Sequence, residues 1–169
     1  MIIVNISDDF TRPADTTSYT SGDLVANSTA AASVVAMTFD GAARSSGGAF
    51  LIRRARLFKT TTTTTAASFR LHLYTTDPSS LTGGIANGDN AAWSTDQAGY
   101  VGSIDLDVSG TNGRAFVDGS GVSGVPLPGP EIAVDLDTGE AIYGLLEARG
   151  SYAPGSAEVF TITLEIVQT

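Results

Sequence analysis

The sequence contains no cysteine, one histidine (His72) and one lysine (Lys59). Without cysteine there is neither a disulfide scaffold nor a thiolate for zinc binding or nucleophilic catalysis. The sequence also lacks a Gly-x-Ser-x-Gly motif, so no activated serine accompanies the histidine. His72 lies between Arg70 and Tyr74 on the polar side of a strand-like segment, and we interpret it as structural. We therefore predict that the chain is not an enzyme and has no catalytic residue and no cofactor.

Positive charge is also scarce, with 9 Lys and Arg residues against 18 Asp and Glu residues and a net charge of −9. Proteins that bind nucleic acid must neutralise phosphates with basic side chains, so we predict neither a nucleic-acid partner nor an anionic membrane partner. No apolar run approaches the roughly 20 residues of a membrane-spanning helix. The first residues have no basic segment and reach Asp8 early, so we expect no signal peptide and synthesis in the cytoplasm.

The most regular pattern in the sequence is an alternation of apolar and polar residues, which is typical of half-buried strands. In Val159–Val167, for example, four apolar side chains alternate with Thr161, Thr163 and Glu165. Similar segments recur along the chain and predict about eight strands. They are Ile2–Ile6, Ser33–Phe39, Phe50–Lys59, Phe69–Tyr74, Ser103–Val108, Glu131–Leu136, Ala141–Arg149 and Val159–Val167.

Turn-forming residues separate these strands, and no segment has a clear helical pattern. Many short antiparallel strands in a chain of 169 residues favour an all-β protein of one domain. We predict an antiparallel two-sheet β-sandwich with jelly-roll-like connections and long loops rich in Gly, Ser and Pro, such as residues 112–130. We expect residues 1–30 to form an extended N-terminal arm and residues 31–169 to form the sandwich.

Two kinds of side chain suggest ligand binding. Trp93 and Tyr100 lie in or beside a loop, and such aromatic rings can stack on a sugar, although a lone Trp more often clamps a loop onto its sandwich. Asp89, Asp105 and Asp107 offer oxygen atoms of the type that Ca²⁺ prefers. Their spacing matches no EF-hand loop, and acids on strand faces are usually solvated. We therefore predict no bound metal.

The only arginine cluster is Arg53, Arg54 and Arg56 within a predicted strand. Consecutive strand residues point to opposite faces, so one of these arginines would point inward unless an acid meets it. Arginine also binds carboxylates in a bidentate manner. We expect these arginines to be paired, either within the protein or across a contact with another subunit.

Several stretches in the first two thirds of the chain resemble small structural proteins of tailed bacteriophages and prophages. The matching stretches follow the same order along the chain, and none of them contains a catalytic motif. They are Phe10–Ser28, Gly48–Leu57, Phe69–Tyr74, Asn87–Trp93 and Tyr100–Leu106. The resemblance implies a head decoration, or cement, protein that binds the major capsid protein, stabilises the shell and forms a homo-oligomer, often a trimer.

If the resemblance holds, the protein is made in the host cytoplasm and becomes part of the virion on the outer surface of the capsid. The acidic composition suits the outside of a DNA-filled shell better than its inside. The alternative is a tail, fibre or receptor-binding module that takes a glycan as its ligand. Fibres tend to be longer and to contain repeats, which this sequence lacks.

For contacts with the capsid or with a neighbouring subunit we favour the N-terminal segment as well as the arginine cluster. Arg12 and Pro13 set an extended turn, because proline fixes its own φ and biases the preceding residue away from helix. Tyr19 and Asp23 add an amphipathic ring and an acid. The same residues could instead hold the N-terminal segment on its own sandwich, and the sequence leaves both interpretations open.

Overall fold

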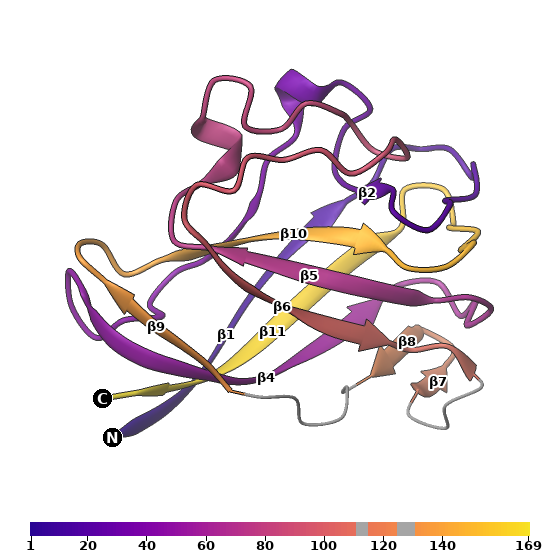
Figure 1. Cartoon of the computed structure of the whole chain (residues 1–169). Helices are drawn as coiled ribbons and strands as arrows, with labels where there is room; N and C mark the ends of the chain where they lie inside the picture. The colour runs from indigo at the N-terminus through magenta and orange to yellow at the C-terminus, as the bar shows by residue number, and fades with distance from the viewer. Residues whose placement is uncertain (111–114, 125–130) are drawn as a thin grey trace.

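The computed structural model describes residues 1–110, 115–124 and 131–169. These residues form two antiparallel sheets that pack face to face, which confirms the predicted β-sandwich (Figure 1). The described residues include two short 3₁₀ helices, η1 (Ala31–Ser33) and η2 (Pro78–Ser80). The loops that carry η1 and η2 lie beyond β10 (Ile142–Ala148) at one end of the sandwich (Figure 1).

The first sheet has the order β1-β11-β4-β8-β7, and β9 also pairs with β4. Its central strands are β11 (Val159–Gln168) and β4 (Gly48–Lys59), and β1 (Ile2–Thr11) forms one edge. Beyond β4 lie three shorter strands: β9 (Ile132–Leu136) pairs with the first half of β4, β8 (Gly121–Gly124) pairs with its last residues, and β7 (Ala115–Asp118) pairs with β8.

The second sheet has the order β2-β10-β5-β6, and β3 also pairs with β10. Its strands are β2 (Leu24–Val25), β3 (Met37–Phe39), β5 (Ser68–Tyr74), β6 (Tyr100–Asp107) and β10. All eight strand segments predicted from the sequence correspond to strands here. The alternation did not reveal β2, β7 and β8, which have two to four residues each.

Eight of the strands pair in a nested manner. The first strand pairs with the last (β1 with β11), and further inward β3 pairs with β10, β4 with β9, and β5 with β6. A long hairpin folded over in this way distributes its strands between two sheets and gives a jelly roll. The chain ends therefore lie side by side, with Ile2 opposite Gln168 (Figure 1).

Two expected boundaries differ from the structure. Residues 1–30 do not form an arm outside the sandwich, because β1 pairs with β11 along its whole length and β2 pairs with β10. The expected loop over residues 112–130 contains the β7–β8 hairpin, in which Val117 pairs with Val122. The rest of that loop, including Asn112-Gly113 and Pro128-Gly129-Pro130, lies outside the described residues.

The core lies between the sheets and uses the inward side of each alternating strand. From β11 it takes Phe160, Ile162 and Leu164, and from β5 it takes Phe69 and Leu71, all fully buried. Phe69 packs edge to face on Phe160 with ring centroids 5.3 Å apart, which links the two sheets. The polar residues between these positions consequently face outward, and they form the surfaces described below.

A polar cluster around Lys59 lies inside the sandwich. Lys59, at the end of β4, is fully buried and lies 3.3 Å from Oε1 of Glu158. Lys59 Nζ also donates to the hydroxyl of Tyr152 at 2.9 Å, and that hydroxyl lies 2.7 and 2.8 Å from the two Glu158 oxygens. Burial lowers the pKa of Lys59, and Glu158 acts against this shift. The cluster ties the end of β4 to the segment before β11.

Candidate functional site

A hollow of about 410 Å³ opens on the outer face of the second sheet. Its floor comes from the outward residues of β5, His72 and Tyr74, and from Tyr100 at the start of β6. Residues 93–97 form its wall. Backbone hydrogen bonds fix this wall to neighbouring loop segments, among them Trp93 N–H to Gly22 O and Asp96 N–H to Gly84 O, both at 2.7 Å.

Four aromatic rings meet in the hollow. Trp93 stacks on His72 with ring centroids 4.2 Å apart and an angle of 28° between the planes. Tyr100 contacts His72 at 5.8 Å and Tyr74 at 5.4 Å. Tyr74 is buried beneath the wall and its hydroxyl lies 3.1 Å from the hydroxyl of Thr95, whereas Tyr100 stays 43% exposed. The rings are therefore fixed by one another, and Tyr100 is the one most open to solvent.

Charged residues on the same sheet face are paired across neighbouring strands. His72 Nε2 lies 2.8 Å from Oε2 of Glu147, whose other oxygen accepts from Arg149 at 2.9 Å. Arg70 binds Asp105 at 2.7 and 3.2 Å. Burial lowers the pKa of His72 from its ordinary 6.5, although the hydrogen bond to Glu147 acts in the opposite direction. Near neutral pH, His72 is therefore an uncharged ring held in place by Trp93 and Glu147.

The structure brings together Trp93 and Tyr100, the two aromatic residues selected from the sequence, and adds six residues that the sequence analysis did not assign to a binding site. These are His72, Tyr74, Ser94, Thr95, Asp96 and Gln97. The alternation did show that His72 and Tyr74 point away from the core. It did not show that the segment before Tyr100 folds back over that face of the sheet, because this depends on backbone contacts with residues distant in sequence.

The arginine cluster lies on the outer face of the first sheet, and none of its members points inward. A β-bulge is the reason: Ile52 pairs with Ile166 and Arg54 pairs with Glu165, so Arg53 is an extra residue in β4. The sequence allowed for an inward arginine unless an acid met it, and acids on the outer face do meet Arg53 and Arg54. Ile52 and Ala55 on either side of the bulge are both buried, and the intervening arginines are both exposed.

The three arginines differ in their pairing. Arg54 lies 3.0 Å from Glu165, and Arg53 lies 3.2 Å from Glu131 and 3.9 Å from Glu165. Arg56 forms no ion pair with any described residue and, together with Arg54 and Glu165, lines a second hollow of about 270 Å³. We call the exposed side chains of Arg53, Arg54 and Arg56 the arginine face. Part of its charge remains uncompensated.

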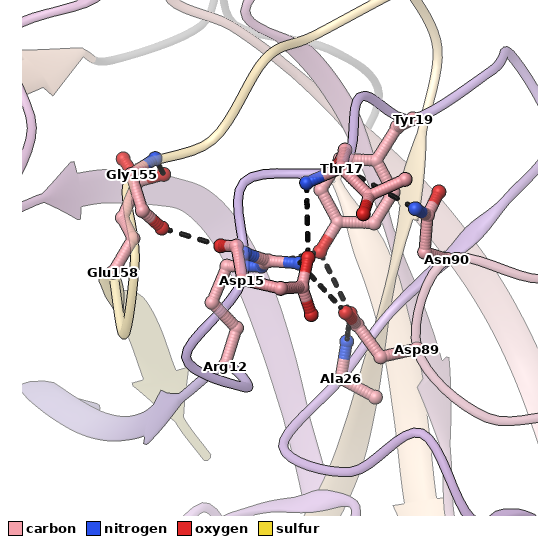
Figure 2. A network of polar contacts seen from close by, with 9 residues as sticks. All are labelled: Arg12, Asp15, Thr17, Tyr19, Ala26, Asp89, Asn90, Gly155 and Glu158. Atoms are coloured by element: carbon pink, nitrogen blue, oxygen red, sulfur yellow. Dashed lines mark hydrogen bonds and ion pairs between the residues drawn. The ribbon is translucent and has the colours of Figure 1, made fainter.

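For the N-terminal residues selected for subunit contacts, the structure agrees with the second of the two interpretations, in which they hold the segment on its own sandwich. Arg12 and Tyr19 are 2% and 1% exposed, and Figure 2 shows them meeting Asp89 in one network. Arg12 Nη2 lies 2.9 Å from Asp89 Oδ2, Arg12 Nε donates to the Tyr19 hydroxyl at 2.9 Å, and that hydroxyl donates to Asp89 Oδ1 at 2.7 Å. Neither residue lines an exposed contact surface, since both hold the segment onto its own sandwich.

The other two selected N-terminal residues also make local contacts. Pro13 is half-buried, and its carbonyl accepts hydrogen bonds from Asp15 N–H and Ala157 N–H. Asp23 is 9% exposed, and its Oδ2 accepts from the backbone and the hydroxyl of Thr20 at 2.6 and 2.8 Å. Both contacts stabilise the turns that lead from β1 to β2.

The three acids considered as metal ligands have other partners. Both oxygens of Asp89 are used, because Oδ1 also accepts from Ala26 N–H at 2.8 Å. Burial raises the pKa of Asp89, while its hydrogen bonds from Ala26, Tyr19 and Arg12 act in the opposite direction. Asp105 binds Arg70, and Asp107 accepts from Ser109 N–H. Among the described residues, no group of three or more His, Asp or Glu side chains is arranged to hold a metal ion.

Fixed partners hold the titratable side chains that the sequence analysis considered for chemistry. In residues 1–110, 115–124 and 131–169 the only histidine is stacked and paired, and the buried carboxylates are held by fixed donors. Within the described residues, no helix has the length and apolar character of a membrane span.

No protein-family model matches the sequence, and a search of the curated proteins finds no match.

Proposed function

We propose that this chain is a structural protein of a bacteriophage virion that decorates the outer surface of the capsid and stabilises the shell. The sequence resemblance suggests this role. A jelly roll of one domain, held by a continuous core and buried ion pairs, suits a module that must stay folded on an exposed particle. The excess of acidic residues suits the outside of a shell filled with DNA.

The arginine face is the observation that carries the proposal. In a chain of net charge −9, the bulge in β4 turns three arginines outward on one sheet face. Their side chains stay accessible, at 45% for Arg53 and 55% for Arg54. Guanidinium groups bind carboxylates in a bidentate manner, so this face suits an acidic patch on the major capsid protein or on a second copy of the chain.

Decoration does not require a tight contact between one copy and the capsid. Symmetric copies that touch both one another and the lattice bind together, and multivalency then raises the total affinity. We propose a homo-oligomer, with the trimer as the expected form. The partners are the major capsid protein and the chain itself, at the outer surface of the virion.

The test uses expanded empty heads that lack this protein. The purified chain is added, free and bound chain are separated by sedimentation, and bound copies are located by cryo-EM. We expect saturable binding at repeated outer sites. The double variant R54E/R56E should bind at least about tenfold more weakly, because like charges then oppose the acidic patch.

Arg44 provides the control, because like Arg56 it is an exposed arginine without an ion pair to the described residues, but it lies outside the arginine face. R44E should bind heads as the unchanged chain does. Light scattering of the purified chain checks the trimer. The proposal is wrong if heads take up no protein, or if R44E and R54E/R56E lose binding equally.

A further inference from the structure

The aromatic hollow on the second sheet has no part in the proposed attachment, which uses the first sheet. Its volume of about 410 Å³ falls within the range of sites for small ligands, about 300 to 1,000 Å³. Its lining combines rings with polar side chains, as such sites usually do. The hollow therefore requires an explanation of its own.

The rings offer an apolar platform with one accessible member. Trp93 and Tyr74 are packed against a buried cluster that includes Leu24 and Leu145, so they cannot turn away. Tyr100, at 43% exposed, contacts both His72 and Tyr74 and remains open on the solvent side. A rigid ring that is partly open to solvent binds flat apolar surfaces at little cost in side-chain entropy.

The wall next to the rings supplies hydrogen-bonding groups with part of their capacity free. Asp96 Oδ1 accepts from Ala98 N–H at 2.7 Å, which fixes the carboxylate, and Oδ2 has no hydrogen bond to a described residue. The side chains of Ser94 and Gln97 likewise make no hydrogen bond within the described part of the chain, and both line the hollow. Acceptors and donors are thus available within reach of the ring platform.

The charged residues that line the hollow narrow the class of ligand it can bind. Asp96 is the only carboxylate in the lining, and no lysine or arginine contributes to it. Phosphates, sulfates and nucleotides need cationic partners and would be repelled. A ligand that presents an apolar face to aromatic rings and several hydroxyls to a carboxylate and an amide, without negative charge, is a neutral sugar ring.

We propose that this hollow binds neutral pyranose units of a carbohydrate. The C–H face of the sugar packs on Tyr100 beside Trp93, and Asp96 Oδ2 accepts hydrogen bonds from ring hydroxyls. Because the hollow is open at the surface, the sugar can be a free glycoside or one unit of a longer chain. This activity is independent of attachment to a capsid and gives a decorated particle a second, sugar-binding face.

Trp93 makes the test direct, because it is the only tryptophan in the sequence and it lies in the hollow. The purified chain is titrated with methyl glycosides of glucose, galactose and mannose and with N-acetylglucosamine, and Trp93 emission is recorded. We expect a saturable change with at least one of them. Oligosaccharides of the responding sugar then show whether a free unit or a longer chain binds more tightly.

Variants assign the response to the hollow. Y100A should weaken binding at least about tenfold, and D96A should do the same. F116A is the control, because Phe116 is an aromatic residue that is 69% exposed on β7, in the other sheet. Circular dichroism and thermal unfolding verify that each variant is folded, and heteronuclear NMR of unchanged protein locates the bound sugar independently of any substitution.

The outcomes separate this proposal from capsid decoration. R54E/R56E should lose head binding and keep sugar binding. Y100A should lose sugar binding and keep head binding. No response to any neutral glycoside overturns the sugar proposal and leaves decoration intact. A stronger response to glucose 6-phosphate than to glucose, or an equal loss with F116A and Y100A, would also overturn it.

Discussion

Arg12 and Asp89 lie 77 residues apart in the sequence and form an ion pair of 2.9 Å in which neither side chain is exposed. The pair joins the end of β1 to the segment that precedes Trp93. Asp89 also accepts a hydrogen bond from Ala26 N–H, so three separate stretches of chain meet at one carboxylate (Figure 2). The network therefore helps to position the wall of the aromatic hollow.

Removing one member of this pair should strongly destabilise the fold. In R12A the Asp89 carboxylate stays buried without its cation, and we expect the free energy of unfolding to fall by about 3 to 5 kcal/mol. Urea unfolding measures the change. D15A is the control: Asp15 also binds Arg12 but is 39% exposed, so its loss should cost no more than about 1 kcal/mol. Equal effects of the two substitutions would contradict this account.

Breaking the second buried pair, Lys59 with Glu158, should destabilise the fold by an amount that depends on pH in the alkaline range. E158A leaves the Lys59 ammonium without its carboxylate, and we expect a loss of about 3 to 5 kcal/mol at pH 7. Burial already lowers the pKa of Lys59 below its ordinary 10.5, so the unfolded chain binds the proton more readily than the folded one. The penalty should shrink as the pH rises toward 10.5. Urea unfolding at pH 7 and pH 10 tests this, and a constant penalty would refute it.

His72 should report its own titration through Trp93. Burial holds the pKa of His72 below 6.5, and protonation places an imidazolium 4.2 Å from the indole, so we expect Trp93 emission to fall with a midpoint below pH 6.5. In the same window the unfolded state takes up the proton first, so the free energy of unfolding decreases as the pH falls below 6.5. H72Q should abolish the emission change, and a midpoint above 6.5 would contradict the assignment.

The bulge predicts which deletion in β4 is tolerated. Removing Arg53 takes out the extra residue, and the pairs on both sides, Ile52 with Ile166 and Arg54 with Glu165, keep their register. Removing Arg56 shifts the strand by one position, which turns Leu57 out of the core or breaks its pairing with Ile162. We expect cooperative thermal unfolding for the Arg53 deletion and its loss for the Arg56 deletion. Cooperative unfolding of both variants would show that the register is not fixed at this point.

The sequence was sufficient to predict the fold class, because burial on one face of a strand leaves a period of two. The segments Phe69–Tyr74 and Val159–Val167 show this alternation of apolar and polar residues, and both lie in the observed sheets. The strands that were missed are short or, like Gly121–Gly124, have little alternation to detect. The bulge at Arg53 was missed because a one-residue insertion in a strand is visible only once its partner strand is known.

The candidate site was predicted in part. Trp93 and Tyr100 stood out as aromatic residues near a loop, and they do line one hollow. The sequence could not decide whether Arg12 and Tyr19 face a partner or their own sandwich, because a charged residue is normally exposed and the buried partner of Arg12, Asp89, is distant along the chain. Long-range pairing of this kind leaves no local pattern.

The burial of Lys59 has a practical consequence for covalent labelling. It is the only lysine in the sequence, and its side chain is fully buried in the folded protein. Acylating reagents and amine cross-linkers should therefore leave it unmodified until the sandwich opens. Mass spectrometry of the peptide that contains Lys59, after a brief pulse of such a reagent, would measure directly how often the sandwich opens.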